Sequence, residues 1–267
     1  MTQSAYESLV LERREGVAHL TFNRPLQRNA LTHAMMRELE AALSALAADE
    51  AVRVVLLRGA GGNFCAGGDL NAMGAMPPPA PGERDPLYAP HRQYGDALAR
   101  LNSLPQPVVA VVEGAAVGGG LGMACCADVV IVHEAAKLGM PEPRWGFIPS
   151  QIIPFVVRRI GEGPARYLAM MTETFGGRRA LELGIAQFCC ASEQEIDATL
   201  ARVLTSLRKG APHALSAAKR LVLSVAGAND QAVLDDAAAT LVGLLRQDEA
   251  AAGIAAFLAK RRPPWAE

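Results

Sequence analysis

The sequence predicts an α/β fold, and three observations lead to that prediction. Two apolar runs, 52–58 and 108–112, are typical of strands that are buried on both faces. A glycine-rich turn follows each of these runs, at 59–68 and at 118–122. Strand patterns alternate with helical ones up to Ser150, and almost everything after it has helical periodicity. We therefore expect stacked ββα or βαβ units that cover both faces of a sheet, followed by helices.

The first predicted elements are a hairpin and a helix. Strands at 9–13 and 17–22 flank a turn at 15–16, which favours a β-hairpin. Thr32 is expected to cap a helix that runs to about Ala48. The apolar residues of this helix recur at helical spacing: Met35, Leu39, Leu43 and Leu46.

The middle of the chain continues the alternation. A proline-rich segment, 76–90, is expected to be a structureless excursion, because proline lacks the N–H group that regular elements need. A helix at 91–104 precedes the strand 108–112. A shorter helix, 120–127, then leads into a strand at 128–132.

The C-terminal part of the chain is predicted to be helical. Predicted helices lie at 151–160, 164–171, 178–183, 193–208, 212–226, 230–246 and 249–260. The last of them are rich in alanine and leucine on all sides, which is more apolar surface than a solvated helix usually carries. We therefore expect this region to be buried against another subunit.

The composition is that of a soluble globular enzyme. The chain has 267 residues, of which 51% are apolar and 20% charged, and its formal charge is −1. This balance, with few aromatic residues to stack on bases, argues against a nucleic-acid partner. Residues 1–8 are polar and lack the pattern of a secretory signal, and no apolar run approaches the roughly 20 residues that cross a bilayer. We expect a cytoplasmic protein with no membrane partner.

The cysteines and histidines do not predict a metal site. The chain has five cysteines, Cys65, Cys125, Cys126, Cys189 and Cys190. Without a CxxC motif they are expected to be buried thiols in a reducing compartment. The histidines are His19, His33, His91, His133 and His213, and none of them has metal-ligand spacing. We therefore expect neither a metal nor a separate cofactor.

Two glycine-dense turns, 64–69 and 118–123, carry the strongest chemical signal. Glycine lets a backbone approach a ligand closely, so two adjacent turns can direct two N–H groups at one oxygen atom. That arrangement is an oxyanion hole, and the second turn precedes a helix whose dipole favours negative charge. A dinucleotide site is disfavoured, because the second turn follows more than a hundred residues and reads GGGxG rather than GxGxxG. Glycines needed only for tight packing remain an alternative.

Glu142 is the one conspicuously placed acid. Pro141 and Pro143 fix the backbone on either side of it. Its neighbours are largely apolar: Leu138, Met140, Trp145 and Phe147. Such surroundings raise a carboxyl pKa by desolvation, as a general acid or base requires. The alternative is a solvent-facing acid at the start of a helix. Cys65, beside the first turn, lacks a histidine partner and is interpreted as a packing residue.

With these residues in view, the chain resembles the crotonase family of enoyl-CoA hydratases and isomerases along almost its whole length. The matching segments are 21–25 (TFNRP), 29–31 (NAL), 64–70 (FCAGGDL), 113–114, 118–120, 141–142, 146–149 (GFIP) and the basic tail at 260–262. The resemblance implies a crotonase-like spiral of ββα units with a C-terminal helical trimerisation region. The implied boundaries are a core with the acyl-CoA site at 1–200 and an oligomerisation region at 201–267.

The resemblance also implies roles for individual residues. The N–H groups of Gly68 and Gly119 would bind the thioester oxygen of an acyl-CoA, and Glu142 would act as acid and base. The implied CoA contacts come from backbone around Arg24–Leu26, Ala30 and Ala66, with Asp69 and Leu70 as further substrate-binding residues. Phe257 and Lys260 would reach the CoA of a neighbouring subunit. Coenzyme A would be part of the substrate, and the implied assembly is a homotrimer or hexamer.

One departure from the family pattern bears on mechanism. Two-acid hydratases carry a first glutamate at the position of Gly122, 20 residues before the second, which is Glu142. In its details the chain resembles the isohexenylglutaconyl-CoA hydratases of acyclic terpene degradation, on segments 112–125, 148–161 and 260–265. The implied reaction is addition of water to a branched glutaconyl-type enoyl-CoA. A Δ3,Δ2-enoyl-CoA isomerase with one acid, and a non-catalytic CoA- or RNA-binding homologue, remain alternatives.

A glutaconyl-type substrate brings two further expectations. The segment 76–90 is a candidate for accommodating a long isoprenoid tail. Arg84, Arg92 and Arg144 are candidates for binding the second carboxylate, with ordinary surface charge as the alternative for each.

Overall fold

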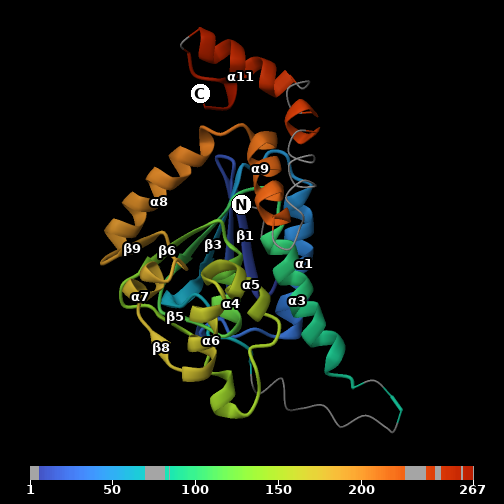
Figure 1. The fold of residues 1–267 in the computed structure, drawn as a ribbon, viewed down its shortest axis with the longest axis vertical. Helices are drawn as coiled ribbons and strands as arrows, with labels where there is room; N and C mark the ends of the chain where they lie inside the picture. Colours follow the sequence, from blue (N-terminus) through green and yellow to red (C-terminus); the bar gives the residue numbers. More distant parts are fainter. Residues whose placement is uncertain are drawn as a thin grey trace.

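The computed structural model describes residues 6–69, 82–83, 85–225, 239–243, 248–259 and 261–266. Figure 1 shows strands at the centre with helices packed around them and α11 (Asp248–Leu258) at one end. The architecture is α/β, as the sequence predicted.

The larger sheet has six strands in the order β1-β2-β3-β4-β6-β9. Their bounds are β1 Leu9–Arg14, β2 Val17–Phe22, β3 Val54–Gly59, β4 Val108–Val112, β6 Val129–His133 and β9 Phe188–Cys190. The predicted hairpin is confirmed, because β1 and β2 pair antiparallel, while every later pair is parallel. The strand predicted from 52 begins at Val54, because the N–H of Val52 bonds the carbonyl of Asp49 in the preceding turn.

A second, three-stranded sheet has the order β5-β7-β8. It consists of β5 Ala115–Val117, β7 Lys137–Gly139 and β8 Thr174–Phe175. The sequence did not predict these strands, nor β9, because two or three residues are too few for a period-two pattern. β5 follows β4 after two residues, and it positions the second glycine turn.

Two helices cover one side of the core. In α1 (His33–Ala47), the Thr32 hydroxyl accepts a hydrogen bond from the N–H of Met35 at 3.2 Å, which confirms the predicted cap. The buried face of α1 contains all four predicted apolar residues. α3 (Tyr88–Asn102) packs against it and begins three residues earlier than predicted. Pro90 lies in the first turn of α3, where a missing N–H leaves no bond unmade, so the helix includes the last three residues of the predicted excursion. Residues 76–81 and 84 of that segment lie outside the described residues.

The remaining helices agree closely with the prediction. They are α4 Gly119–Cys126, α5 Ile153–Ile160, α6 Glu162–Met171, α7 Gly177–Glu182, α8 Glu193–Arg208 and α9 Pro212–Ser224, with short 3-10 turns η1 Pro25–Gln27, η2 Ala60–Gly62, η3 Glu142–Trp145 and η4 Pro264–Ala266. All eight residues of α4 are buried. Most of the predicted helix 230–246 lies outside the described residues. The boundary predicted at 200 falls within α8, and the division into two regions stays a prediction.

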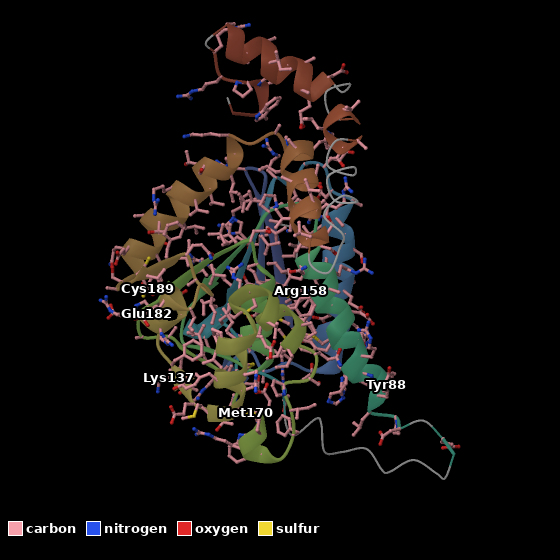
Figure 2. All side chains as sticks on the ribbon, viewed as in Figure 1. Tyr88, Lys137, Arg158, Met170, Glu182 and Cys189 are labelled. Carbon is pink, nitrogen blue, oxygen red and sulfur yellow. The ribbon has the colours of Figure 1, made fainter. Side chains whose placement is uncertain are left out.

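The cysteines are free thiols, and all except the half-buried Cys189 are buried, as expected. Among the described residues, no group of histidine, cysteine and acidic side chains is placed to hold a metal ion. Within the same ranges no helix is both long and apolar enough to cross a membrane. Figure 2 shows the side chains on the ribbon, with Met170 and Tyr88 at the periphery.

Candidate active site

The two glycine turns lie side by side. The N–H of Cys65 donates to the carbonyl of Ala115 at 2.7 Å, and the N–H of Val117 donates to the carbonyl of Cys65 at 3.0 Å. These bonds form a parallel bridge between Cys65 and Ala116. The first turn is thereby held in register with β5 and with the start of α4.

Glycine is required where the turns meet. A Cβ atom on Gly120 would lie 2.2 Å from the carbonyl oxygen of Cys65, which is far inside contact distance. Gly67 has φ +96°, and a Cβ there would lie 2.9 Å from the carbonyl oxygen of Val117. Side chains at either position would force the two backbones apart.

The N–H groups of Gly68 and Gly119 are available to a ligand. The N–H of Leu31 donates to the carbonyl of Gly67, and the carbonyl of Leu31 accepts a hydrogen bond from the N–H of Asp69. Because Gly68 lies between these two residues in a parallel bridge, its own N–H points away from Leu31. Gly119 is the first residue of α4, where an N–H has no partner within the helix. Among the hydrogen bonds of the described residues, neither N–H has an acceptor.

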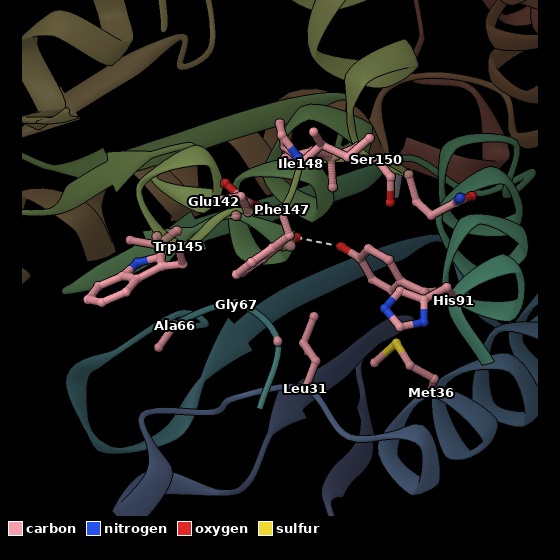
Figure 3. Close-up of a pocket in the computed structure, with 18 of the residues that line it drawn as sticks. Leu31, Met36, Ala66, Gly67, His91, Glu142, Trp145, Phe147, Ile148 and Ser150 are labelled. Atoms are coloured by element: carbon pink, nitrogen blue, oxygen red, sulfur yellow. Dashed lines mark hydrogen bonds between the residues drawn. The ribbon is translucent and has the colours of Figure 1, made fainter. Parts of the chain in front are cut away.

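Both turns open into one cavity of about 190 Å³. Figure 3 shows Glu142 and Phe147 on one side of it, with Leu31 and Met36 on the other. The lining is mainly apolar, including Leu31, Met36, Trp145, Phe147, Ile148 and Ile152. Its titratable side chains are Glu142, Tyr94, His33 and His91.

Glu142, the first residue of η3, has a carboxyl group that is partly withdrawn from water. Its Oε2 atom is buried and has no hydrogen-bond partner among the described residues. Burial raises the pKa of this carboxyl, and a backbone hydrogen bond partly offsets the increase. A Cβ on Gly118, which has φ +53°, would lie 2.5 Å from Oε1. The carboxyl group therefore rests on bare backbone beside the Gly119 N–H, rather than facing bulk solvent.

The raised pKa of Glu142 has a consequence for stability. Folding favours the protonated carboxyl, so the charged form weakens the folded state above the raised pKa. We expect Glu142→Gln to be more stable than the parent near neutral pH. The advantage should shrink as the pH falls through the raised pKa, and it should be smallest below the pKa of the unfolded chain. Urea unfolding midpoints across this range measure the effect, with the exposed Glu50→Gln as control. If the stability difference between Glu142→Gln and the parent were the same at all pH values, the Glu142 carboxyl would not be desolvated on folding.

Gly122 has no room for a side chain. A Cβ there would lie 2.3 Å from Cγ2 of Ile152 and 3.5 Å from the hydroxyl of Tyr94. The isoleucine thus fills the space into which a glutamate at this position would extend.

A variant pair tests this packing. Gly122→Ala is expected to lower the free energy of unfolding by about 1–3 kcal/mol through overpacking. In an Ile152→Ala background the same substitution should cost much less, because the methyl group enters vacated space. Chemical denaturation of the four proteins in this double-mutant cycle measures the coupling. If the changes in unfolding free energy of the two single variants add up to that of the double variant, the two side chains do not compete for the same space.

Tyr94 is a site residue that the sequence analysis missed. Its hydroxyl donates to the carbonyl of Gly119 at 2.7 Å, and burial raises its pKa well above the usual value. The bond ties α3 to the first residue of α4. No motif marks Tyr94, since only the tertiary packing of α3 brings it to the glycine turn.

Several of the proposed binding residues do not line the cavity. Arg24 pairs with Asp69 at 3.1 Å and also donates to the carbonyl of Ala30, so these three residues brace the loop between β2 and α1. Leu26 is 92% exposed beside them, whereas Ala66 lines the cavity. Leu70, Lys260 and the side chain of Phe257 lie outside what the structure describes.

The other sequence candidates have different surroundings. Arg92 pairs with Asp96 at 2.8 Å, Arg144 donates to the hydroxyl of Thr172 at 2.9 Å, and neither lines the cavity. Arg84 lies outside the described residues. Burial raises the pKa of the Cys65 thiol to about 12, which agrees with a packing role rather than a nucleophile.

Comparison with known proteins shows which enzymes the chain is similar to. The family model described as enoyl-CoA hydratase/isomerase matches residues 12–267. The chain is 30% identical to a 2,3-dehydroadipyl-CoA hydratase of Escherichia coli over 96% of this chain and 98% of that protein. It is 27% identical to a peroxisomal Delta(3,5)-Delta(2,4)-dienoyl-CoA isomerase of Arabidopsis thaliana, with full coverage of both chains.

Solved structures are similar as well. Pseudomonas aeruginosa AtuE superposes with a TM-score of 0.93 at 44% identity, covering 98% of this chain and 100% of that one. An enoyl-CoA hydratase/isomerase from Marinobacter aquaeolei also gives a TM-score of 0.93, at 39% identity, with 97% and 99% coverage. The spiral of ββα units implied by the sequence is thus supported by several solved relatives.

Proposed function

Because the chain belongs to the enoyl-CoA hydratase/isomerase family, we propose that it adds water to a branched, glutaconyl-type enoyl-CoA. The substrate proposed is isohexenylglutaconyl-CoA or a close relative, as in acyclic terpene degradation. One observation carries the proposal: the unpaired N–H groups of Gly68 and Gly119 open into the same cavity as the desolvated carboxyl of Glu142.

The two amides act on the thioester oxygen. Both N–H groups donate to this oxygen, and their bonds strengthen as it gains the negative charge of an enolate. The dipole of α4 adds to the effect at Gly119, which is the first residue of that helix. The pair therefore stabilises the enolate more than the bound ester, which is what accelerates the reaction.

Glu142 moves the protons. As carboxylate, it takes one proton from a water molecule while the water oxygen bonds to the β-carbon and the double-bond electrons move to the enolate. The resulting carboxylic acid then returns a proton to the α-carbon, and the carboxylate is restored. Its raised pKa suits both steps, because the group must accept and donate near neutral pH.

The apolar lining supports a branched hydrocarbon chain. Trp145, Phe147 and Ile148, on the side of the cavity that holds Glu142, offer surface that excludes water from an alkenyl substituent. A substrate branch without polar groups is stabilised when it is buried against this apolar surface. The substrate tail is therefore placed along this wall.

Isomerisation is the second candidate function. Within the described lining Glu142 is the one carboxyl group, and a single acid that moves a proton between two carbons needs no positioned water. Among the relatives are enzymes named dienoyl-CoA and 1,2-epoxyphenylacetyl-CoA isomerases.

A panel of enoyl-CoA esters separates the two functions. We expect a mass increase of about 18 Da with 3-substituted glutaconyl-CoA, and incorporation of ¹⁸O from labelled water. Migration of the double bond without a mass change would instead establish the isomerase. Failure of every ester to react would overturn both functions.

We further propose that the protein is a homotrimer or hexamer. Apolar side chains are exposed on α9, including Val222 at 72%, and on α6, including Met170 at 74%. Light scattering is expected to give three or six times the chain mass of 28.1 kDa. A monomer at micromolar concentration would contradict the proposal.

A further inference from the structure

The cavity contains one pair of side chains that the proposed mechanism does not use. These are His33, the first residue of α1, and His91 in the second turn of α3. Their rings lie 6.4 Å apart at an angle of 64°, and both residues line the cavity. Figure 3 places His91 beside Met36, on the side of the cavity away from Glu142.

His33 has an unsatisfied polar atom. Its Nε2 atom is buried and has no hydrogen-bond partner among the described residues. A buried donor or acceptor without a partner loses its hydrogen bonds to water and gains none in return, which destabilises the folded state. Burial also lowers the pKa of His33, with smaller contributions from His91 and Arg37. A ligand atom at Nε2 would relieve this penalty.

His91 presents its free nitrogen to the same space. Its Nδ1 lies 2.8 Å from the carbonyl oxygen of Leu87, which can only accept, so Nδ1 carries a hydrogen. That bond fixes the ring and leaves Nε2 for a ligand. In the imidazolium form, Nε2 is a second donor.

A glutaconyl-type acyl chain carries a carboxylate that these groups are suited to bind. No lysine or arginine is among the described residues that line the cavity, and Arg92 and Arg144 are engaged elsewhere. Within the described lining, the two imidazoles are then the side chains that can take up a positive charge, and a carboxylate bound beside them favours that charged form. A carboxylate has two oxygens, one for each Nε2, and bonds to charged groups are the strong ones.

We propose that His33 and His91 form the subsite that binds the second carboxylate of the acyl chain. This inference rests on the proposed function, because it assumes an acyl-CoA in this cavity. It assigns the two branches of the substrate to different walls, with the carboxylate on the histidine pair and the hydrocarbon on the apolar residues. The histidines thereby select dicarboxylic over monocarboxylic acyl chains.

The test compares two esters that differ by one carboxylate, glutaconyl-CoA and crotonyl-CoA. Their dissociation constants are measured by calorimetry on Glu142→Gln, in which turnover is slowed. His33→Leu and His91→Leu, added singly, are expected to reduce the preference for glutaconyl-CoA by about tenfold or more, as loss of a charged hydrogen bond implies. His33→Gln keeps an N–H donor and should retain part of the preference. His213→Leu, which removes an exposed imidazole outside the cavity lining, is the matched control and should leave the preference unchanged.

The outcomes separate the inference from the proposed function. Equal weakening of both esters, or no weakening, would overturn the carboxylate subsite and leave a packing role for the pair. If the preference falls as expected while no ester is hydrated, the subsite stands and the hydratase proposal fails. If the parent protein hydrates glutaconyl-CoA but both histidine variants keep the preference for this ester over crotonyl-CoA, the hydratase proposal stands and the carboxylate subsite is overturned.

Discussion

Replacing Glu142 with glutamine is expected to lower the turnover number by about 10²–10⁴-fold, the range typical of a positioned acid or base. The amide has the same size, so its packing on Gly118 is retained, but it can neither take a proton from water nor return one to carbon. Affinity for the acyl-CoA should change little, because the N–H groups of Gly68 and Gly119 are unaltered. Steady-state kinetics with an ester that the parent protein hydrates measure the turnover number, and a binding titration measures the affinity.

A matched control and a clear contrary result accompany this prediction. Glu50→Gln removes the same charge from an exposed turn remote from the cavity and should retain full activity. Glu142→Gln with an unchanged turnover number would refute the role of the carboxyl group. A loss of binding in proportion to the loss of turnover would show that Glu142 holds the substrate instead.

Substituting alanine for Gly120 is expected to have the second large effect. The new methyl group would lie 2.2 Å from the Cys65 carbonyl, which is backbone and cannot rotate away. That carbonyl also accepts the Val117 N–H, so the contact that joins the two turns must open. We expect a fall of at least about 1–3 kcal/mol in the free energy of unfolding. The rate should fall by about 10²–10³-fold if one amide leaves the thioester oxygen.

Chemical denaturation and kinetics on the same samples test the Gly120 variant. Gly163, in the exposed first turn of α6, offers a control because a Cβ there meets nothing within 4 Å. Gly163→Ala should be neutral or slightly stabilising. Normal stability and activity in Gly120→Ala would mean that the turns are not held as described.

The long elements could be predicted from the sequence, because each repeats its pattern over enough residues. The cap at Thr32, the buried face of α1 and the strand β4 all follow from local rules. Pro90 was misinterpreted for a physical reason: proline disrupts a helix interior but is tolerated in a first turn. The short strands β5 and β7 pair with each other, and β7 also pairs with β8, so neither strand can be recognised from its own segment alone.

The candidate site could be predicted in part. Glycine turns and a proline-flanked acid are local signals, and both led to the cavity. Tyr94 and His91 lie on a helix whose sequence shows only ordinary amphipathicity, so their approach to the turns depends on how α3 packs on α1 and α4. Backbone contacts with CoA around Arg24 stay a prediction, whereas the pairing of its guanidinium with Asp69 could not be predicted because the two residues are 45 positions apart.

The contact between Glu142 and Gly118 bears on the handedness of the product. The carboxyl group lies against the residue that immediately precedes the Gly119 amide, so the acid and the amide face the cavity from adjacent positions. A substrate oxygen held by that amide fixes the plane of the enolate, and the water activated by Glu142 would then reach the β-carbon across a single face of this plane. Under the proposed chemistry the protein would therefore form one stereoisomer at the β-carbon.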